Sequence, residues 1–175
     1  PKHGNDADVQ DIHILSDGSF VCGYIIYEES RIVIMITHRD KTGGILKKTS
    51  FGGQPCGIAL SLAVDENIGN IIMAMVNRIT LLGLDGETKG MIKVSDARIS
   101  AMEINASPEI SLIASGFEDG TLELRRFNGD VIACLELEGG SVNAVAMYGD
   151  RVLAAMAGSA VYVLSAEGNL LNSFS

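Results

Sequence analysis

The chain of 175 residues lacks tryptophan and has only three prolines, three cysteines and three histidines. Three scattered histidines are too few for a zinc site or a nucleophilic triad. The cysteines, Cys22, Cys56 and Cys134, are odd in number and widely spaced, which is typical of reduced thiols in a core rather than of a metal site. We therefore expect no catalytic, cofactor-binding or metal-binding residues, a protein that is not an enzyme, and a cytoplasmic location.

Long apolar runs and positive charge are also scarce. No segment approaches 18 uninterrupted apolar residues, so no membrane insertion is expected. The chain has 13 Lys and Arg against 22 Asp and Glu, a net charge of −9, which excludes non-specific binding of nucleic acid because phosphate contacts need a basic face. Residues 1–8 contain no Met and no apolar leader, so we expect a piece of a longer chain.

Glycine is abundant, with 20 residues, and one glycine turn recurs along the chain. It is found at Gly43-Gly44, Asp85-Gly86, Asn128-Gly129 and Glu167-Gly168, spacings of about 42, 43 and 39 residues, and such a period is typical of propellers and solenoids. Apolar segments with a period of two flank each turn, and the 3.6-residue pattern of helical solenoids is absent. The repeat therefore predicts strands.

The clearest repeat spans residues 99–137 and predicts four antiparallel strands. Its turns are the polar break at 105–109, Glu118-Asp119-Gly120 and Asn128-Gly129. Four strands in about 40 residues indicate one propeller blade, so the fold class is all-β, with about four blades. The expected boundaries are 1–8 for a polar N-terminal segment, 9–53 for blade 1, 54–95 for blade 2, 96–138 for blade 3 and 139–175 for blade 4, all within one propeller or part of one.

One blade carries a recognisable motif. The segment SGFEDGTLEL, residues 115–124, resembles the second-to-third strand hairpin of a WD40 repeat, with Arg125 and Arg126 where that family usually has Trp and Asp. In general architecture the resemblance covers nearly the whole chain from about Val9. Since the chain has no Trp and no Gly-His pair, the Ser/His/Asp/Trp hydrogen-bond network of typical repeats cannot be built. The resemblance implies a divergent WD40-type β-propeller.

Two finer resemblances point to different functions. Residues 84–86, 98–103, 118–120 and 125–127 are similar to the late blades of the C-terminal propeller in BEACH-domain proteins, which implies a scaffold in vesicle and lysosome trafficking. Residues 15–20 and 49–53 resemble bacterial repeat propellers of the SBBP type. The alternative is thus a small-ligand-binding or enzymatic propeller, of the quinoprotein or SBBP-repeat kind, with carboxylates or aromatics converging on a central channel.

The first interpretation predicts a non-catalytic platform that holds partner proteins on its blade-end loops and strand edges. Arginine and exposed aromatic residues dominate binding hot spots, and this selects the candidates. The candidate partner-binding residues are Arg98, Phe117, Glu118, Arg125, Arg126 and Tyr148.

Closure of the propeller leaves three alternatives open. WD40 propellers usually need about seven blades, and four such blades would leave two apolar blade faces and a strand edge uncovered. The chain is then completed by the remaining blades of a larger propeller, by a second copy in a homodimer that completes a ring, or by closing as a four-bladed ring. The sequence also leaves open which loops share a face, because that depends on strand register.

Overall fold

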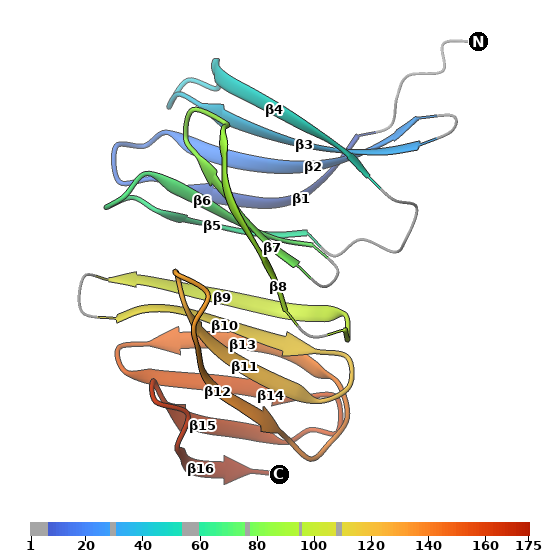
Figure 1. Ribbon diagram of the computed structural model, residues 1–175, viewed down its shortest axis with the longest axis vertical. Helices are drawn as coiled ribbons and strands as arrows, with labels where there is room; N and C mark the ends of the chain where they lie inside the picture. Colours follow the sequence, from blue (N-terminus) through green and yellow to red (C-terminus); the bar gives the residue numbers. More distant parts are fainter. Residues whose placement is uncertain (1–6, 29–30, 54–59, 76–77, 95, 108–109) are drawn as a thin grey trace. The chain divides into compact units, whose positions relative to one another are not determined.

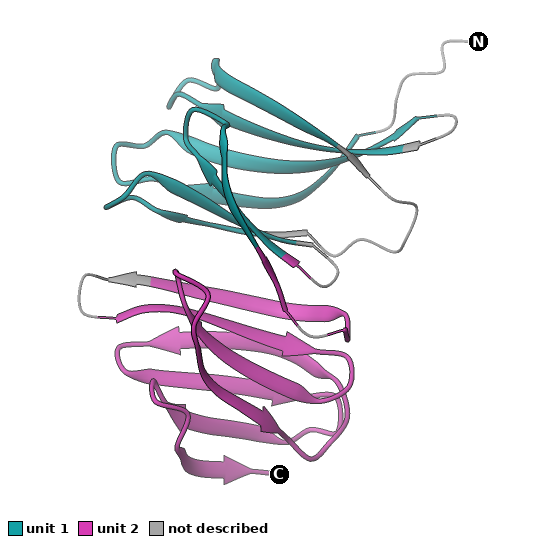
Figure 2. Cartoon of the chain, viewed as in Figure 1, with its two compact units in different colours: residues 1–75, 79–91 teal, residues 76–78, 92–175 magenta. Residues whose placement is uncertain are grey.

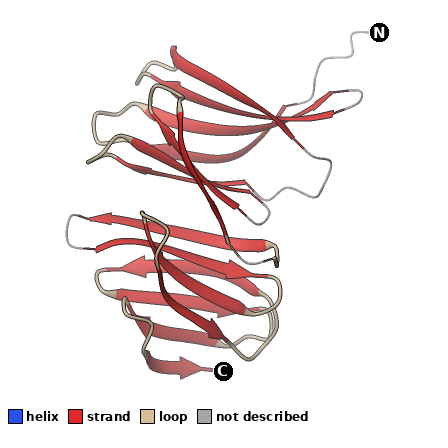
Figure 3. Ribbon diagram, in the orientation of Figure 1, coloured by secondary structure: helices blue, strands red, loops and turns tan. Residues whose placement is uncertain are grey.

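The computed structural model describes residues 7–28, 31–53, 60–75, 78–94, 96–107 and 110–175. Within these ranges the regular structure consists of sixteen β-strands and no helix (Figure 3). The strands form four antiparallel sheets of four strands each, and strands that follow one another in sequence are neighbours in each sheet (Figure 1). The prediction of an all-β fold made of four-stranded blades is therefore confirmed.

We call the four sheets blades 1 to 4, and each is defined by its strands. Blade 1 consists of β1 (Ala7–Ile14), β2 (Phe20–Glu28), β3 (Arg31–Arg39) and β4 (Ile45–Gly53). Blade 2 consists of β5 (Leu60–Asp65), β6 (Asn70–Met75), β7 (Arg78–Gly83) and β8 (Thr88–Lys93). Blade 3 consists of β9 (Ile99–Ser107), β10 (Ile110–Phe117), β11 (Thr121–Arg126) and β12 (Val131–Glu136). Blade 4 consists of β13 (Val142–Tyr148), β14 (Arg151–Met156), β15 (Val161–Ser165) and β16 (Leu170–Phe174).

The same glycine turn joins the third and fourth strands of every blade. Gly43, Gly86, Gly129 and Gly168 have φ angles of 91°, 81°, 95° and 84°, a left-handed conformation that favours glycine. Each donates its N–H to the carbonyl oxygen three residues earlier, over 2.8 to 2.9 Å. The turns that mark the repeat in the sequence are therefore equivalent in structure, and residues can be compared between blades by their distance from this glycine.

The chain divides into two compact units (Figure 2). Unit 1 comprises residues 1–75 and 79–91, and unit 2 comprises residues 76–78 and 92–175. Blade 1 and most of blade 2 thus belong to unit 1, whereas the first residue of β7, the end of β8, and blades 3 and 4 belong to unit 2.

The core of unit 1 lies between blades 1 and 2. β1 runs beside β5, and the carboxylate of Asp11 in β1 accepts a hydrogen bond of 2.8 Å from the backbone N–H of Leu62 in β5. Because side chains alternate along a strand, one face of blade 1 points toward blade 2. The buried residues of this core are Leu15, Val21, Ile34 and Ile36 from blade 1 and its first turn, and Leu62, Val64, Ile71, Met73 and Leu82 from blade 2.

The core of unit 2 lies between blades 3 and 4 in the same way. β9 runs beside β13, and the hydroxyl of Ser100 donates a hydrogen bond of 2.6 Å to the carbonyl oxygen of Val142. Burying aliphatic side chains here stabilises the unit by roughly 25 cal/mol for each Å² of apolar surface removed from water. The buried residues are Leu112, Ala114, Leu122 and Leu124 from blade 3, and Val142, Val152, Ala154, Met156 and Leu164 from blade 4.

Candidate interaction surface

The turns of unit 2 gather at two opposite ends. Ser100 near the start of β9 bonds to the start of β13, and the side-chain amide of Asn105 near the end of β9 donates to the carbonyl oxygen of Gly149, 3.2 Å away, just after β13. β9 and β13 therefore run in the same direction. The turns after β13 and after β11 lie at one end, which we call the Tyr148 end. The segment before β9 and the turn after β10 lie at the other, which we call the Arg98 end.

Tyr148 is the most exposed of the large apolar residues, with 84% of its surface accessible. The turn that carries it is held in place by hydrogen bonds from two neighbouring segments. Asn105 bonds to the carbonyl oxygen of Gly149, and the N–H of Ala166 donates to the carbonyl oxygen of Asp150 over 2.9 Å. The aromatic ring is thus presented to solvent by a turn whose backbone is already ordered.

Two exposed arginines lie at the Tyr148 end. Arg151 follows Tyr148 in the same turn, and its Nε lies 3.1 Å from a carboxylate oxygen of Asp150 in an ion pair that is open to water. Arg126 is exposed at the end of β11, and its backbone N–H donates to the carbonyl oxygen of Asp130 over 2.9 Å, which fixes the adjoining glycine turn. An exposed aromatic with arginines at the same end is the composition of binding hot spots.

The Arg98 end joins two of the predicted residues to each other. Nη1 of Arg98 lies 3.2 Å from a carboxylate oxygen of Glu118, with 39% and 53% of the two side chains exposed. The backbone N–H of Glu118 also donates to the carbonyl oxygen of Arg98 over 3.0 Å. An exposed ion pair of this kind contributes only about 0–1 kcal/mol, so its charges remain accessible to a partner at little cost.

The expectation that Phe117 is exposed is wrong, because its side chain is fully buried. Phe117 is the last residue of β10, and a register shift after Gly116 pairs it with Ile99 at the start of β9. Ile113 and Ser115, which alternate with it along β10, are also at most 1% exposed, so Phe117 continues a buried face of the strand, which the turn signal in the sequence does not reveal. Phe117 therefore belongs to the interior of blade 3.

Arg125 is likewise not a solvated loop residue, and the expectation of exposure is wrong for it too. Its side chain is only 13% exposed and forms an ion pair with Glu123, itself 8% exposed. Both nitrogens of the guanidinium fork take part: Nε bonds to one carboxylate oxygen of Glu123, and Nη2 lies 2.7 Å from the other. Nη1 donates to the carbonyl oxygen of the turn residue Gly129 over 2.8 Å. The guanidinium, the carboxylate and the carbonyl of the turn glycine therefore bond to one another within blade 3.

The structure adds two residues that sequence reasoning missed at this surface. Arg151 stands beside Tyr148, and Asn105 fixes the turn that presents it. The Tyr-Gly-Asp-Arg sequence at 148–151 is a turn signal with an arginine next to an aromatic, and that signal was sufficient to find Arg151. Asn105 gave no such signal, because its role depends on β9 and β13 lying side by side.

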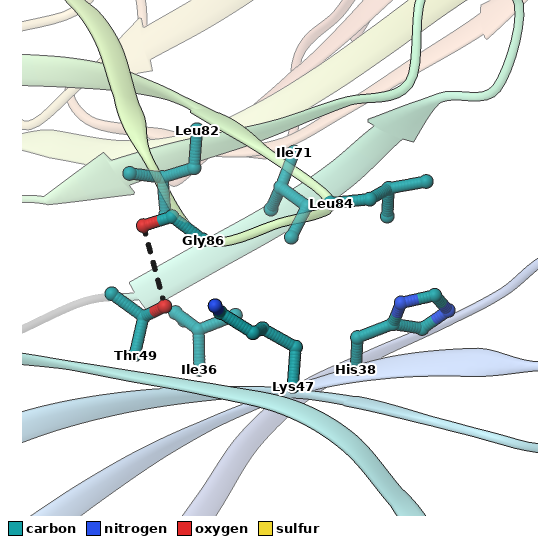
Figure 4. Close-up of a pocket in the computed structure, with 8 residues that line it drawn as sticks. All are labelled: Ile36, His38, Lys47, Thr49, Ile71, Leu82, Leu84 and Gly86. Carbon is teal, nitrogen blue, oxygen red and sulfur yellow. Dashed lines mark hydrogen bonds between the residues drawn. The ribbon is translucent and has the colours of Figure 1, made fainter.

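A cavity in unit 1 has too little volume for a cofactor or a metabolite. It measures about 10 Å³, the space of one water molecule. The hydroxyl of Thr49 donates to the carbonyl oxygen of Gly86 across its margin, 3.3 Å away (Figure 4). Its lining consists of Ile36, His38, Lys47, Thr49, Ile71, Leu82, Leu84 and Gly86.

Within the described ranges, no group of three His, Cys, Asp or Glu side chains is placed to hold a metal ion. Cys22 is buried as expected, whereas the expected core position is wrong for Cys134, which is exposed; both are free thiols, and Cys56 lies outside the described residues. Desolvation of the thiol by its neighbours, followed by the nearby Glu123 carboxylate, raises the pKa of Cys134. In the described part of the chain, no helix has the length and apolar character needed to cross a membrane.

Solved structures with the same arrangement of strands include both designed and natural propellers. The computationally designed Ika4 protein is 15% identical with a TM-score of 0.68, and the match covers 93% of this chain and 94% of that one. The WD40 β-propeller domain of Doa1 is 15% identical with a TM-score of 0.71, covering 98% of this chain and 56% of that one. A chain of the mitotic checkpoint complex is 11% identical with a TM-score of 0.74, covering 96% and 53%.

The fold is a β-propeller fold. The chain supplies four blades of it, and it spans just over half the length of the Doa1 domain and of the checkpoint-complex chain. No protein-family model matches the sequence. No curated protein matches it either. Ser115, the first residue of the WD40-like motif, has a buried hydroxyl without a hydrogen-bond partner among the described residues.

Proposed function

We propose that the protein is a non-catalytic platform that binds partner proteins through the Tyr148 end of unit 2. The observation that supports this most directly is Tyr148 itself, 84% exposed on a turn held by Asn105 and Ala166. An aromatic side chain presented by an ordered backbone loses little conformational entropy on binding, which makes it an effective anchor. Arg126 and Arg151 add donors for carboxylates or backbone carbonyls of a partner.

The propeller fold of the Doa1 domain and of the checkpoint-complex chain agrees with this proposal, since a rigid scaffold commonly carries its binding residues on loops, which in a propeller lie at the blade ends. Arg98 and Glu118 form a second candidate patch at the opposite end of unit 2, where each already has the other as a partner. We therefore place the main contact at the Tyr148 end, where Arg126 and Tyr148 are exposed.

The test is a binding measurement with a matched tyrosine control. Proteins retained by the immobilised chain would be identified, produced separately and titrated against the wild type, Tyr148→Ala and Tyr27→Ala. Tyr27 is also exposed, at 49%, but lies in blade 1. A hot-spot tyrosine contributes about 2 kcal/mol or more, so Tyr148→Ala should weaken binding roughly 30-fold and Tyr27→Ala should leave it unchanged. Equal binding by all three proteins would refute the proposal.

The finer assignments remain part of this proposal. A scaffold role in vesicle and lysosome trafficking rests on the resemblance to BEACH-domain proteins alone. A reducing, cytoplasmic location agrees with the free thiols of Cys22 and Cys134. The alternative of a small-ligand-binding or enzymatic propeller has no observation in its favour, and the cavity of about 10 Å³ in unit 1 does not accommodate such a ligand.

A further inference from the structure

Both faces of blade 4 carry apolar side chains, but these differ in burial. The face toward blade 3 carries Val152, Ala154 and Leu164, all at most 1% exposed. Strand register places a second set of side chains on the opposite face, because paired residues in antiparallel strands point to the same side. The apolar part of this outer face of blade 4 consists of Ala144, Ala146, Leu153, Ala155, Val161, Val163 and Phe174, which are half-buried or exposed, and Tyr148, Arg151, Ser165 and Asn172 lie on the same face.

Blade 1 has a corresponding outer face, on the side away from blade 2. By register its apolar part consists of Val9, Ile12, Ile14, Phe20, Cys22, Tyr24, Ile26, Val33 and Met35, and Thr37, Arg39, Lys48 and Ser50 lie on the same face. Val9, Ile12 and Ile14 in β1 are 52%, 53% and 72% exposed. The residues of the opposite face, Val21 and Ile36, are at most 2% exposed because they pack in the core of unit 1. Blade 1 therefore exposes large aliphatic groups where blade 4 exposes small ones.

The residue four positions before each turn glycine shows how blades meet. In blades 2 and 4 it is Leu82 and Leu164, and each packs into the core toward the preceding blade. In blades 1 and 3 it is Arg39 and Arg125, and both donate Nη1 to the carbonyl oxygen of the turn glycine over 2.8 Å. The outer faces of blades 1 and 3 are thus built alike. The face of blade 1 away from blade 2 is therefore of the same kind as the faces that carry Leu82 and Leu164 toward a preceding blade, with arginine in place of leucine.

We propose that the outer face of blade 4 in one copy of this chain packs against the outer face of blade 1 in a second copy. Within unit 1 and within unit 2, one blade packs through the face that points to the next blade in the chain, and the next blade packs through the face that points back to it. The proposed contact joins one face of each kind. The small Ala144, Ala146 and Ala155 side chains of blade 4 leave room for Ile12 and Ile14 of the partner, an alternation of small and large residues that packs well.

The size of the two faces fits a stable dimer. Four strands about 4.8 Å apart and six residues long, at about 3.3 Å each, give a face of roughly 400 Å². A dimer in which each copy contributes both faces would bury roughly 800 Å² per copy, the typical size of a specific interface. Two copies of four blades each would also make a number of blades within the range of about four to eight found in propellers.

The first test is the mass in solution, measured by light scattering on a size-exclusion column. The wild type should have twice the 18.5 kDa of one chain. Val163→Glu on blade 4 and Ile12→Glu on blade 1 should each give a monomer, since each places a charge in the contact. Ile68→Glu is the matched control, because Ile68 is 55% exposed in a turn of blade 2, outside both faces; it should remain a dimer.

Mixing the two variants tests the pairing of the faces and also their folding. The Val163→Glu chain keeps blade 1 intact and the Ile12→Glu chain keeps blade 4 intact, so an equimolar mixture should form a heterodimer through one undamaged contact. Circular dichroism of each variant should match the wild type. A monomeric wild type would overturn the proposal, because the two outer faces would then not join two copies of the chain. A mixture that dimerises no more than either variant alone, at every concentration measured, would also overturn it.

Discussion

Replacing Arg125 with leucine is expected to cost about 3–5 kcal/mol of unfolding free energy, because the change leaves the buried Glu123 carboxylate without its partner. The two side chains are 13% and 8% exposed and meet through both oxygens of the carboxylate. An uncompensated charge in such a position must either remain poorly solvated or take up a proton on folding. Both outcomes destabilise the folded state.

The other blades indicate how this loss can be repaired. The positions equivalent to Glu123 and Arg125, counted from the turn glycine, hold Thr80 and Leu82 in blade 2. The double variant Glu123→Thr with Arg125→Leu therefore copies a pair that the chain already uses. Since replacing both members of a buried ion pair by groups that pack well is often neutral or stabilising, we expect the double variant to lie within about 1 kcal/mol of the wild type.

Arg39 provides the matched control. It donates to the carbonyl oxygen of Gly43 as Arg125 does to Gly129, but its second partner is the neutral hydroxyl of Thr37, 3.2 Å from Nε. Arg39→Leu removes hydrogen bonds without stranding a charge, so it should cost only about 1–2 kcal/mol. Guanidinium unfolding followed by circular dichroism measures all three variants. If Arg125→Leu costs no more than Arg39→Leu, or if the double variant is as unstable as Arg125→Leu, the reasoning is refuted.

Three further outcomes are expected. Gly168→Ala should destabilise the protein by more than the roughly 1–2 kcal/mol of a left-handed alanine, because the new Cβ would lie 2.2 Å from that of Ala133. Gly43→Ala is the control, because its Cβ meets nothing within 4 Å, and thermal unfolding should show only the conformational cost. Hydrogen bonds from the hydroxyl and N–H of Thr42 lower the pKa of Asp40, so its stabilisation should be complete above about pH 4 and be lost as the pH falls further; Asp40→Asn should flatten acid unfolding curves, and an unchanged curve would contradict this. The raised pKa of the Cys134 thiol predicts slower alkylation at pH 7.5 than for a model thiol peptide, followed by mass spectrometry.

Most of the fold could be predicted from the sequence repeat. Turns at Gly43, Gly86, Gly129 and Gly168 could be found because a left-handed backbone selects glycine, and that selection acts locally. Alternating apolar residues then indicated the strands on either side. The division into two units was not predictable in this way, because it depends on which blade faces pack together rather than on any local signal.

The candidate surface was less predictable, and its errors have a common cause. Phe117 and Arg125 lie within two residues of turn segments, and residues near turns are usually exposed. Phe117 instead continues the buried run of β10, and an ion pair with Glu123 holds Arg125 inside the blade. Burial at the end of a strand and buried ion pairs depend on contacts across strands, which residue type and turn distance do not specify. The exposure of Tyr148 was easier to predict, because Tyr148 is the last residue of β13 and the Gly149-Asp150 turn follows it directly.

Comparison between repeats recovers part of what a single segment hides. Arg125 read alone resembles a surface arginine, but its equivalents Leu82 and Leu164 are core residues, which indicates that the position is an interior one. An arginine at such a position must be satisfied within its own blade, and the carbonyl of the turn glycine is the acceptor within reach in both blades that have one. In a repeat protein, the burial of a charged residue is therefore best judged from what the other repeats carry at the same distance from the turn.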